Sequence, residues 1–235
     1  MAPPDGLRLD HLALAQGSFA LTADLHVPPG DRIAIMGPSG GGKSTLLAAI
    51  AGFLPPLRGR ILWQGRDLAP LAPGDRPLSI LFQDQNLFAH LTAAQNVGLA
   101  LHPGLRLTAA DHARVAAALA RVGLAELGAR RPADLSGGQQ SRVALARLLL
   151  RDRPLVLLDE PFSALGPALK AEMLSLLADI LSDTGATLLM VTHDPGDARA
   201  IADGVILVAE GRAEPPRPTA ALLADPPPAL RAYLG

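Results

Sequence analysis

The hydrophobic positions of the first 36 residues alternate with polar ones and then become continuous. Residues 7–14 and 19–27 partly alternate, which is typical of two half-buried strands, and the Pro-Pro-Gly at 28–30 ends the pair. The run RIAIM at 32–36 is apolar throughout and predicts a buried strand. A glycine-rich loop follows directly, and residues 44–52 then show helical periodicity with a terminal glycine. The sequence therefore predicts a strand, a glycine loop and a helix in that order.

The rest of the chain alternates between strand and helix patterns, apart from one long helical stretch. From about 90 to 152 the segments are rich in Ala and Leu, which indicates an inserted helical subdomain. Alternating strands and helices are typical of a parallel sheet covered on both faces. After Gly211 the chain is rich in proline, and we expect a short C-terminal tail over about 212–235. Further strands are predicted at 59–64, 78–83, 154–159, 187–192 and 205–209, with a helix at about 167–183.

Composition restricts the function classes. The 235 residues are 49% hydrophobic and 18% charged, with a formal net charge of -1, so there is no basic surface for nucleic acid. The absence of cysteine excludes disulfides, iron–sulfur clusters, thiolate zinc sites and cysteine nucleophiles. The N-terminus does not resemble a secretory signal, and the weakly polar runs at 45–57 and 143–150 are shorter than the roughly 20 residues of a bilayer span. We expect a single cytoplasmic domain over residues 1–235.

The loop after the strand at 32–36 has the spacing of a phosphate-binding loop. Its glycines let backbone N–H groups turn toward phosphate oxygens, the helix N-terminus adds positive potential, and the lysine supplies a point charge. Lys43 is one of only two lysines in the chain, against nineteen arginines. The alternative is a tight glycine turn that binds nothing. The nucleotide-binding candidates are Gly37, Pro38, Ser39, Gly40, Gly41, Gly42, Lys43, Ser44 and Thr45, with the Ser44 hydroxyl as a candidate Mg²⁺ ligand.

An acidic pair ends the buried strand at 154–159. Asp159 lies at the carboxyl end of that strand, where its carboxylate can meet a metal at the mouth of the phosphate loop. Glu160 follows immediately and can polarise an attacking water beside the terminal phosphate. The alternative is a solvent-exposed strand end without function. A phosphate loop alone does not distinguish kinases, GTPases and ATPases, but neither lysine is placed to read guanine.

A second anion-binding element precedes the helix after residue 139. Ser136 is a typical N-cap, and the glycines behind it leave backbone N–H groups free at the helix start. Two such elements in one chain suggest a nucleotide site shared between two copies, although an ordinary capped helix is the simpler alternative. The residues of this LSGGQ sequence are Leu135, Ser136, Gly137, Gly138 and Gln139.

Together these motifs resemble the nucleotide-binding subunits of ATP-binding cassette (ABC) transporters, over residues from about 7 to 211. The resemblance implies an α/β P-loop NTPase fold with a mixed sheet, an antiparallel β subdomain and an inserted helical subdomain. It also implies ATPase activity with ATP and Mg²⁺, and LSGGQ as the signature that contacts ATP on the second copy. By matching positions, Gln83 meets metal and attacking water, Asp159 binds magnesium, Glu160 is the general base, and His193 contacts the γ-phosphate.

The chain departs from this family at three places. Where the family usually has an aromatic residue that stacks on adenine, this chain has Leu14 and Gln16, and Phe19 is the nearest ring. Gly166 occupies the place of an aspartate that normally spans the dimer interface, and we expect weaker coupling between the two nucleotide sites. Ser141 stands where glutamine is common, with no consequence that we can assign.

The absence of fused membrane segments favours a subunit of a bacterial importer over an exporter. Residues 81–107 and 162–174 are most similar to the ATPases of thiamine importers. The implied partners are a second copy, an integral-membrane permease and, indirectly, a periplasmic substrate-binding protein, with the chain peripheral on the cytoplasmic face of the inner membrane. Importers of sulfate, molybdate, iron or polyamines are alternatives. A non-transport ABC ATPase and a phosphate-loop kinase are more distant ones, because long coiled-coil inserts and tandem cassettes are absent and a kinase would not explain LSGGQ.

The surface that transmits force to the permease is expected just after Gln83. There Leu87, Phe88 and Leu91 would form an apolar cup for a short helix of the permease. The alternative is that the three side chains belong to the hydrophobic core.

Overall fold

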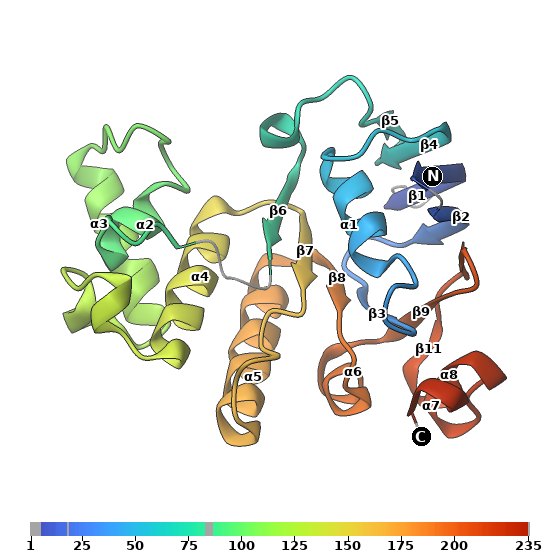
Figure 1. Ribbon diagram of the computed structural model, residues 1–235. Coiled ribbons are helices and arrows are strands. Elements are labelled where there is room, and N and C mark those ends of the chain that lie inside the picture. Colours follow the sequence, from blue (N-terminus) through green and yellow to red (C-terminus); the bar gives the residue numbers. More distant parts are fainter. Residues whose placement is uncertain (1–5, 18, 83–86, 235) are drawn as a thin grey trace. The chain divides into compact units, whose positions relative to one another are not determined.

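The computed structural model describes residues 6–17, 19–82 and 87–234, which form two compact units (Figure 1). The first unit consists of the described parts of Met1–Leu78, Pro154–Asp159 and Gly185–Gly235. The second consists of the described parts of Ser79–Arg153 and Glu160–Thr184, so it holds the expected helical subdomain and also the helix that follows Glu160. That residues 1–235 act as one nucleotide-binding domain stays a prediction.

A mixed sheet forms the centre of the first unit, with strand order β5-β4-β1-β2-β10-β9-β3-β8-β7. β1 runs antiparallel to β2 and β4, whereas β9, β3, β8 and β7 are mutually parallel. The short β10 pairs with both β2 and β9 and so joins the two parts, while β11 pairs with β9. The strands are β1 (Leu7–Gln16), β2 (Phe19–Val27), β3 (Arg32–Met36), β4 (Arg58–Trp63), β5 (Arg66–Asp67), β7 (Leu155–Asp159), β8 (Thr187–Val191), β9 (Gly204–Ala209), β10 (Arg212–Ala213) and β11 (Arg217–Pro218).

The sequence patterns account for both kinds of strand. In β2, Leu21, Ala23, Leu25 and Val27 are buried while the residues that alternate with them are exposed, as the alternation predicts. β8 is buried along its whole length, as expected of a strand with parallel neighbours on both sides. The mixed sheet with an antiparallel part, predicted from the sequence, is confirmed.

Four helices belong to the first unit, and the C-terminal ones pack against the sheet. Leu222 and Leu230 are fully buried in a cluster with Met36 of β3 and Leu207 of β9. The proline-rich segment expected as a tail therefore forms part of the core. Arg76, itself buried, donates from Nη1 to the carbonyls of Ala49 and Ile50 at 3.0 and 2.7 Å and caps the end of α1. The helices are α1 (Lys43–Ala51), α6 (Pro195–Ile201), α7 (Thr219–Ala224) and α8 (Pro228–Leu234), with a 3₁₀ turn η1 (Pro73–Asp75).

The second unit is mostly helical. Thr92, Thr108 and Ser136 cap α2, α3 and α4, each with a reciprocal capping box, and these three helices pack against one another. Its elements are β6 (Leu78–Leu81), which starts at the last residue of the first unit, α2 (Ala93–Gly98), α3 (Ala109–Arg121), η2 (Ala125–Leu127), η3 (Pro132–Asp134), α4 (Gly137–Arg151) and α5 (Pro167–Thr184).

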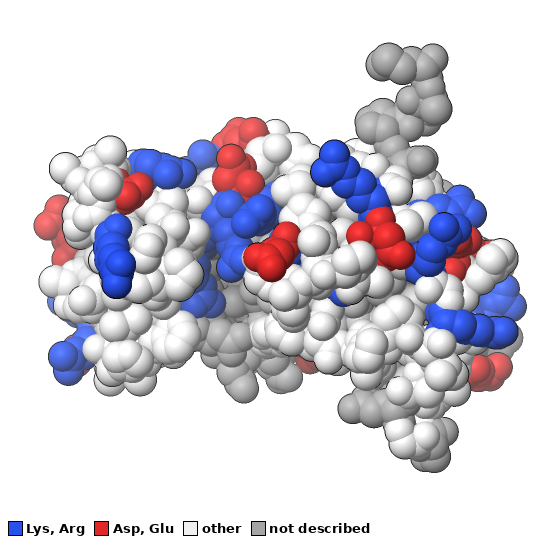
Figure 2. Space-filling view, turned by 90° about the horizontal axis from the view of Figure 1, so that it is seen from above, with Lys and Arg blue, Asp and Glu red and all other residues white. Residues whose placement is uncertain are grey.

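On the face that Figure 2 shows, basic and acidic side chains are interspersed. Among the described residues, no helix has the length and apolar character needed to cross a membrane.

Candidate functional site

Three of the predicted motifs lie at the carboxyl ends of adjacent parallel strands in the first unit. β8 lies between β3 and β7, and its last residue, Val191, is in register with Ile35 of β3 and with Asp159 of β7. The phosphate loop follows β3, Asp159 ends β7, and His193 comes two residues after β8. In sheets of this kind ligands bind outside the carboxyl ends of the strands. The sheet thus brings residues from three distant stretches of sequence to one edge.

The phosphate loop takes backbone conformations that require glycine. Gly37 has φ 145°, and a Cβ there would overlap the carbonyl oxygen of Val208 on β9. Gly40 and Gly42 have φ 74° and 100°. Lys43 is buried, and its Nζ donates to the carbonyls of Gly37 and Pro38 at 2.8 and 2.9 Å. The ammonium group is therefore held inside the curve of the loop, and the first turn of α1 begins behind it.

Phe19 lies directly against this loop. A Cβ built on Gly42 would overlap the Phe19 ring, so the first residue of β2 packs its ring on the turn that starts α1. Gly42 also leaves the N-terminus of α1 without a side-chain cap. From the sequence, Phe19 is only the ring nearest to Leu14 and Gln16, where the family usually has the aromatic residue that stacks on adenine. Its contact with Gly42 joins two residues that lie in separate elements of the chain, which no local motif reveals.

The backbone conformation changes between the two residues of the acidic pair, Asp159 and Glu160. Asp159 ends β7 and is half-buried. Glu160, the next residue and the first of the second unit's segment, has φ 46°, an uncommon value for a residue with a side chain. The Ser163 hydroxyl donates to the Glu160 carbonyl at 3.1 Å. Such strain costs on the order of 1–3 kcal/mol and is often found at functional sites.

The loop after β8 is fixed to the sheet while the side chain of His193 is exposed. The buried Thr192 donates its N–H to the carbonyl of Ile35 at 3.2 Å and its hydroxyl to the Asp197 carboxylate at 2.8 Å. The Tyr233 hydroxyl of α8 lies 3.5 Å from the carbonyl oxygen of His193. The histidine side chain is thus presented at the strand edge by a tightly bonded backbone.

The LSGGQ sequence forms the start of α4 in the second unit. The Ser136 hydroxyl accepts from the Gln139 N–H at 3.3 Å, and the Ser136 N–H donates to the Gln139 side chain at 2.9 Å. Gly138 is buried, and Leu169 of α5 occupies the space that a side chain there would need. A cavity of about 350 Å³ lies beside this turn and is lined by Ser136, Gly138 and Gln139 together with Arg142.

Arg142 and Glu172 are residues that the sequence analysis missed. Arg142 donates to the Val122 carbonyl at the end of α3 at 2.7 Å and forms an ion pair with Glu172 of α5. These contacts fix the first turns of α4 against two neighbouring helices. The sequence from Leu135 to Ser141 gives no sign of these contacts, because the partners of Arg142, Val122 and Glu172, lie at or in other helices.

The structure describes two of the three candidate Mg²⁺ ligands, Ser44 and Asp159. Gln83 lies outside the described residues, so its position is not part of the site geometry. Within the described ranges, no group of three or more His, Cys, Asp or Glu side chains could hold a metal by itself. A hydroxyl and a single carboxylate, as at Ser44 and Asp159, fit Mg²⁺, which keeps several waters and takes its remaining oxygens from substrate phosphates.

The residues expected to form an apolar cup are presented at the surface of the second unit. Phe88 is 50% exposed, and Leu87 and Leu91 are partly exposed, so Phe88 is not a core residue. The fully buried Asn96 of α2 accepts from the Phe88 N–H at 2.8 Å and donates to the carbonyls of Phe88 and Leu91 at 3.1 and 3.2 Å. A buried, satisfied amide thus fixes this loop and holds the Phe88 ring outward.

These features define a phosphate-loop NTPase of the ABC type. A sequence model of the family described as ABC transporter matches residues 21–163, and the chain belongs to that family. It is an ABC-type ATPase.

Individual relatives make the resemblance more specific. A thiamine import ATP-binding protein, ThiQ, of Cereibacter sphaeroides is 69% identical over 229 residues, which cover 97% of this chain and 99% of the relative. ThiQ of Ruegeria sp. is 58% identical over 229 residues, which again cover 97% of this chain and 99% of the relative. Among solved structures, a post-hydrolysis dimer of the ATP-binding cassette MJ0796 bound to ADP and Pi is similar with TM-score 0.77 and 30% identity, covering 91% of this chain and 98% of that one.

Proposed function

We propose that this chain is the ATP-hydrolysing subunit of an importer for thiamine. The observation that carries the proposal is the arrangement at the carboxyl ends of β3, β8 and β7, where the phosphate loop, His193 and Asp159 share one edge. The substrate is inferred from the relatives named for thiamine import, of which the first is 69% identical.

The phosphate loop would bind ATP, which is the substrate. Lys43 would exchange its bonds to the loop carbonyls for the outer phosphates, and the N–H groups from Gly40 to Thr45 would donate to phosphate oxygens. The Phe19 ring, packed on Gly42, offers the adenine base a flat apolar face in place of the aromatic residue that the usual position lacks.

The Ser44 hydroxyl and the Asp159 carboxylate would hold Mg²⁺, with Gln83 as a further oxygen ligand. The ion supplies charge stabilisation to the transferring phosphoryl group. Glu160 would accept a proton from the attacking water, and His193, exposed on a fixed backbone, would donate a hydrogen bond to the γ-phosphate. The products are ADP and inorganic phosphate.

The signature would act on the ATP held by a second copy. Ser136 and the glycines behind it start α4, and the cavity of about 350 Å³ beside Ser136 leaves room for a ligand there. Closure of the two copies around two ATP molecules would pull on an integral-membrane permease, and hydrolysis would let them part. The chain itself would remain peripheral on the cytoplasmic face of the inner membrane, and a periplasmic binding protein would deliver the substrate.

The test is uptake of labelled thiamine, at low external concentration, in cells that lack this gene. The wild-type chain should restore uptake, whereas Glu160→Gln should not, although it is produced at the same level. If uptake does not depend on the gene, the substrate assignment is wrong. The same strains then show whether sulfate, molybdate, iron or a polyamine is the cargo.

A further inference from the structure

The peptide group between His193 and Asp194 is held at both of its polar ends. On one side its N–H, from Asp194, donates to the Thr192 hydroxyl at 3.1 Å. On the other side its carbonyl oxygen, from His193, accepts from the Tyr233 hydroxyl of α8 at 3.5 Å. A peptide group is planar, so bonds at both ends fix its orientation and restrict the ψ angle of His193. The direction of the exposed imidazole therefore depends in part on a residue 40 positions further along the chain.

The Tyr233 ring is itself fixed by the core of the first unit. Leu230, one turn earlier in α8, is fully buried in a cluster with Met36 of β3 and Ala198 of α6. The partly buried Tyr233 ring packs against this same cluster. Its hydroxyl is thus carried by a side chain whose position is set by packing and not only by the hydrogen bond to His193.

The C-terminal segment also holds the other end of α6, the helix that follows the His193 loop. Thr219, the first residue of α7, is buried, and its hydroxyl donates to the carbonyl of Ala202 at 2.7 Å. The Thr219 N–H donates to the carbonyl of Asp203 at 3.0 Å. In Figure 1, α6, α7 and α8 belong to the same end of the chain, and α6 packs against α7. The C-terminal helices therefore contact the backbone both before and after α6.

We propose that Tyr233 is a positioning residue for ATP hydrolysis, which orients the His193 imidazole through the backbone of that histidine. The inference rests on the proposed function in one respect, the contact of His193 with the γ-phosphate. Phosphoryl transfer depends mainly on positioning and on charge stabilisation, so a hydrogen-bond donor contributes most when its direction is fixed in advance. Loss of the Tyr233 hydroxyl leaves the His193 carbonyl free to turn, which slows hydrolysis without weakening the binding of ATP by the phosphate loop.

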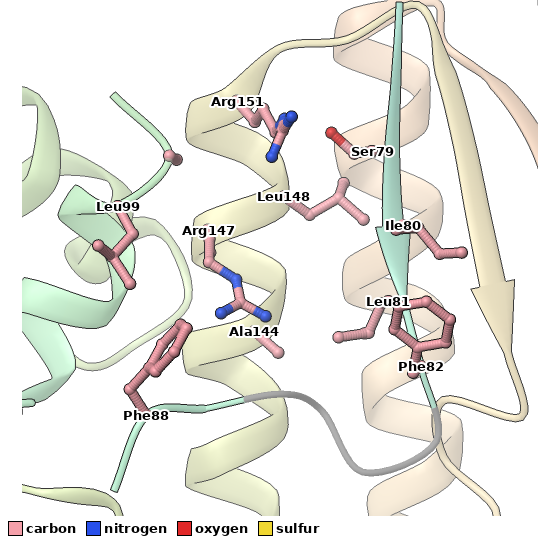
Figure 3. A pocket seen from close by; sticks show the side chains of 11 residues that line it. Ser79, Ile80, Leu81, Phe82, Phe88, Leu99, Ala144, Arg147, Leu148 and Arg151 are labelled. Carbon is pink, nitrogen blue, oxygen red and sulfur yellow. The ribbon is translucent and has the colours of Figure 1, made fainter. Parts of the chain in front are cut away.

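The test is ATP hydrolysis by the purified full-length chain. Tyr233→Phe keeps the ring in the cluster and removes only the hydroxyl, so kcat should fall about threefold while the KM for ATP is unchanged. The Tm should stay within about 3 °C of the wild type. Ser79→Ala is the matched control, because it also removes one hydroxyl. That oxygen faces a pocket of the second unit (Figure 3) and has no hydrogen-bond partner among the described residues, so kcat should not change.

A second readout follows the histidine itself and does not depend on hydrolysis. The NMR resonance of the His193 ring, identified by its absence from His193→Ala, should shift in Tyr233→Phe and stay in place in Ser79→Ala. A Tyr233 that only stabilised the fold would leave this resonance and kcat unchanged.

The outcomes separate this inference from the proposed function. A wild-type kcat in Tyr233→Phe, an equal loss of kcat in Ser79→Ala, or a change in the KM for ATP alone would overturn the inference. An unmoved His193 resonance in Tyr233→Phe would do the same. If His193→Ala hydrolyses ATP at the wild-type rate, the proposed role of the histidine fails instead, and the resonance still shows whether Tyr233 orients its ring.

Discussion

The close approach of the phosphate loop to β9 predicts unequal effects of two alanine substitutions. At Gly40, φ is 74° and a Cβ would meet no atom within 4 Å, so Gly40→Ala costs only backbone strain of about 1 kcal/mol. At Gly37, φ is 145°, and a Cβ would overlap the carbonyl oxygen of Val208 with its carbonyl carbon at 3.0 Å. Overlap with backbone adds about 1–3 kcal/mol to the strain, because β3 and β9 must move apart.

For a chain of this length 1 kcal/mol corresponds to about 2–4 °C in Tm. Gly40→Ala should therefore lower the Tm by about 2–4 °C, and Gly37→Ala, at about 2–4 kcal/mol in total, by roughly 4–16 °C, as measured by calorimetry without nucleotide. Both variants should bind ATP more weakly. Equal losses of Tm, or a smaller loss for Gly37→Ala, would refute the close contact between the loop and β9 on which the position of the phosphate site depends.

Three further substitutions test separate parts of the account. The φ of Gly166 lies outside the left-handed region, and a Cβ there would meet no atom within 4 Å, so Gly166→Asp should fold normally. The substitution should change the ATPase rate. An unchanged rate would show that this position does not couple the two nucleotide sites. Phe19→Ala should weaken ATP binding roughly tenfold in equilibrium titration, as expected for a lost base stack, and Phe19→Tyr should restore it. Burial, and to a smaller extent the nearby Asp203 carboxylate, raises the pKa of Asp31 above its usual value of 3.8. The folded state therefore binds a proton more readily than the unfolded state, and it loses stability as the pH rises through the raised pKa. Asp31→Asn should therefore raise the Tm at pH 7, and the gain should vanish below about pH 4; a gain that persists at pH 3 would contradict this.

The parts of the structure that follow from local patterns were predictable from the sequence. The strand predicted at 32–36 is β3, and the helix expected over 44–52 is α1, displaced by one residue. The Ser136 cap was predicted because a capped helix start needs only a serine and the periodic residues behind it. Phosphate-loop glycines likewise carry their conformation in their own spacing.

The remaining features depend on contacts between residues far apart in the chain. The pairing of β10 with both β2 and β9 joins the two halves of the sheet, yet two residues give no readable pattern. The prolines after Gly211 suggested a tail, whereas the burial of Leu222 and Leu230 depends on a surface that only the folded sheet provides. The Arg142–Glu172 ion pair is of the same kind, because neither residue belongs to a motif.

The central claim is that two copies of this chain close on ATP and that Glu160 limits how long they stay closed. The most direct test is the mass of the purified Glu160→Gln variant, measured by sedimentation velocity with and without ATP. The account predicts a dimer with ATP and a monomer without it, and a monomer under both conditions when Lys43→Met is added. A Glu160→Gln variant that binds ATP but remains monomeric would contradict the shared site and would favour a phosphate-loop enzyme that works as a single copy.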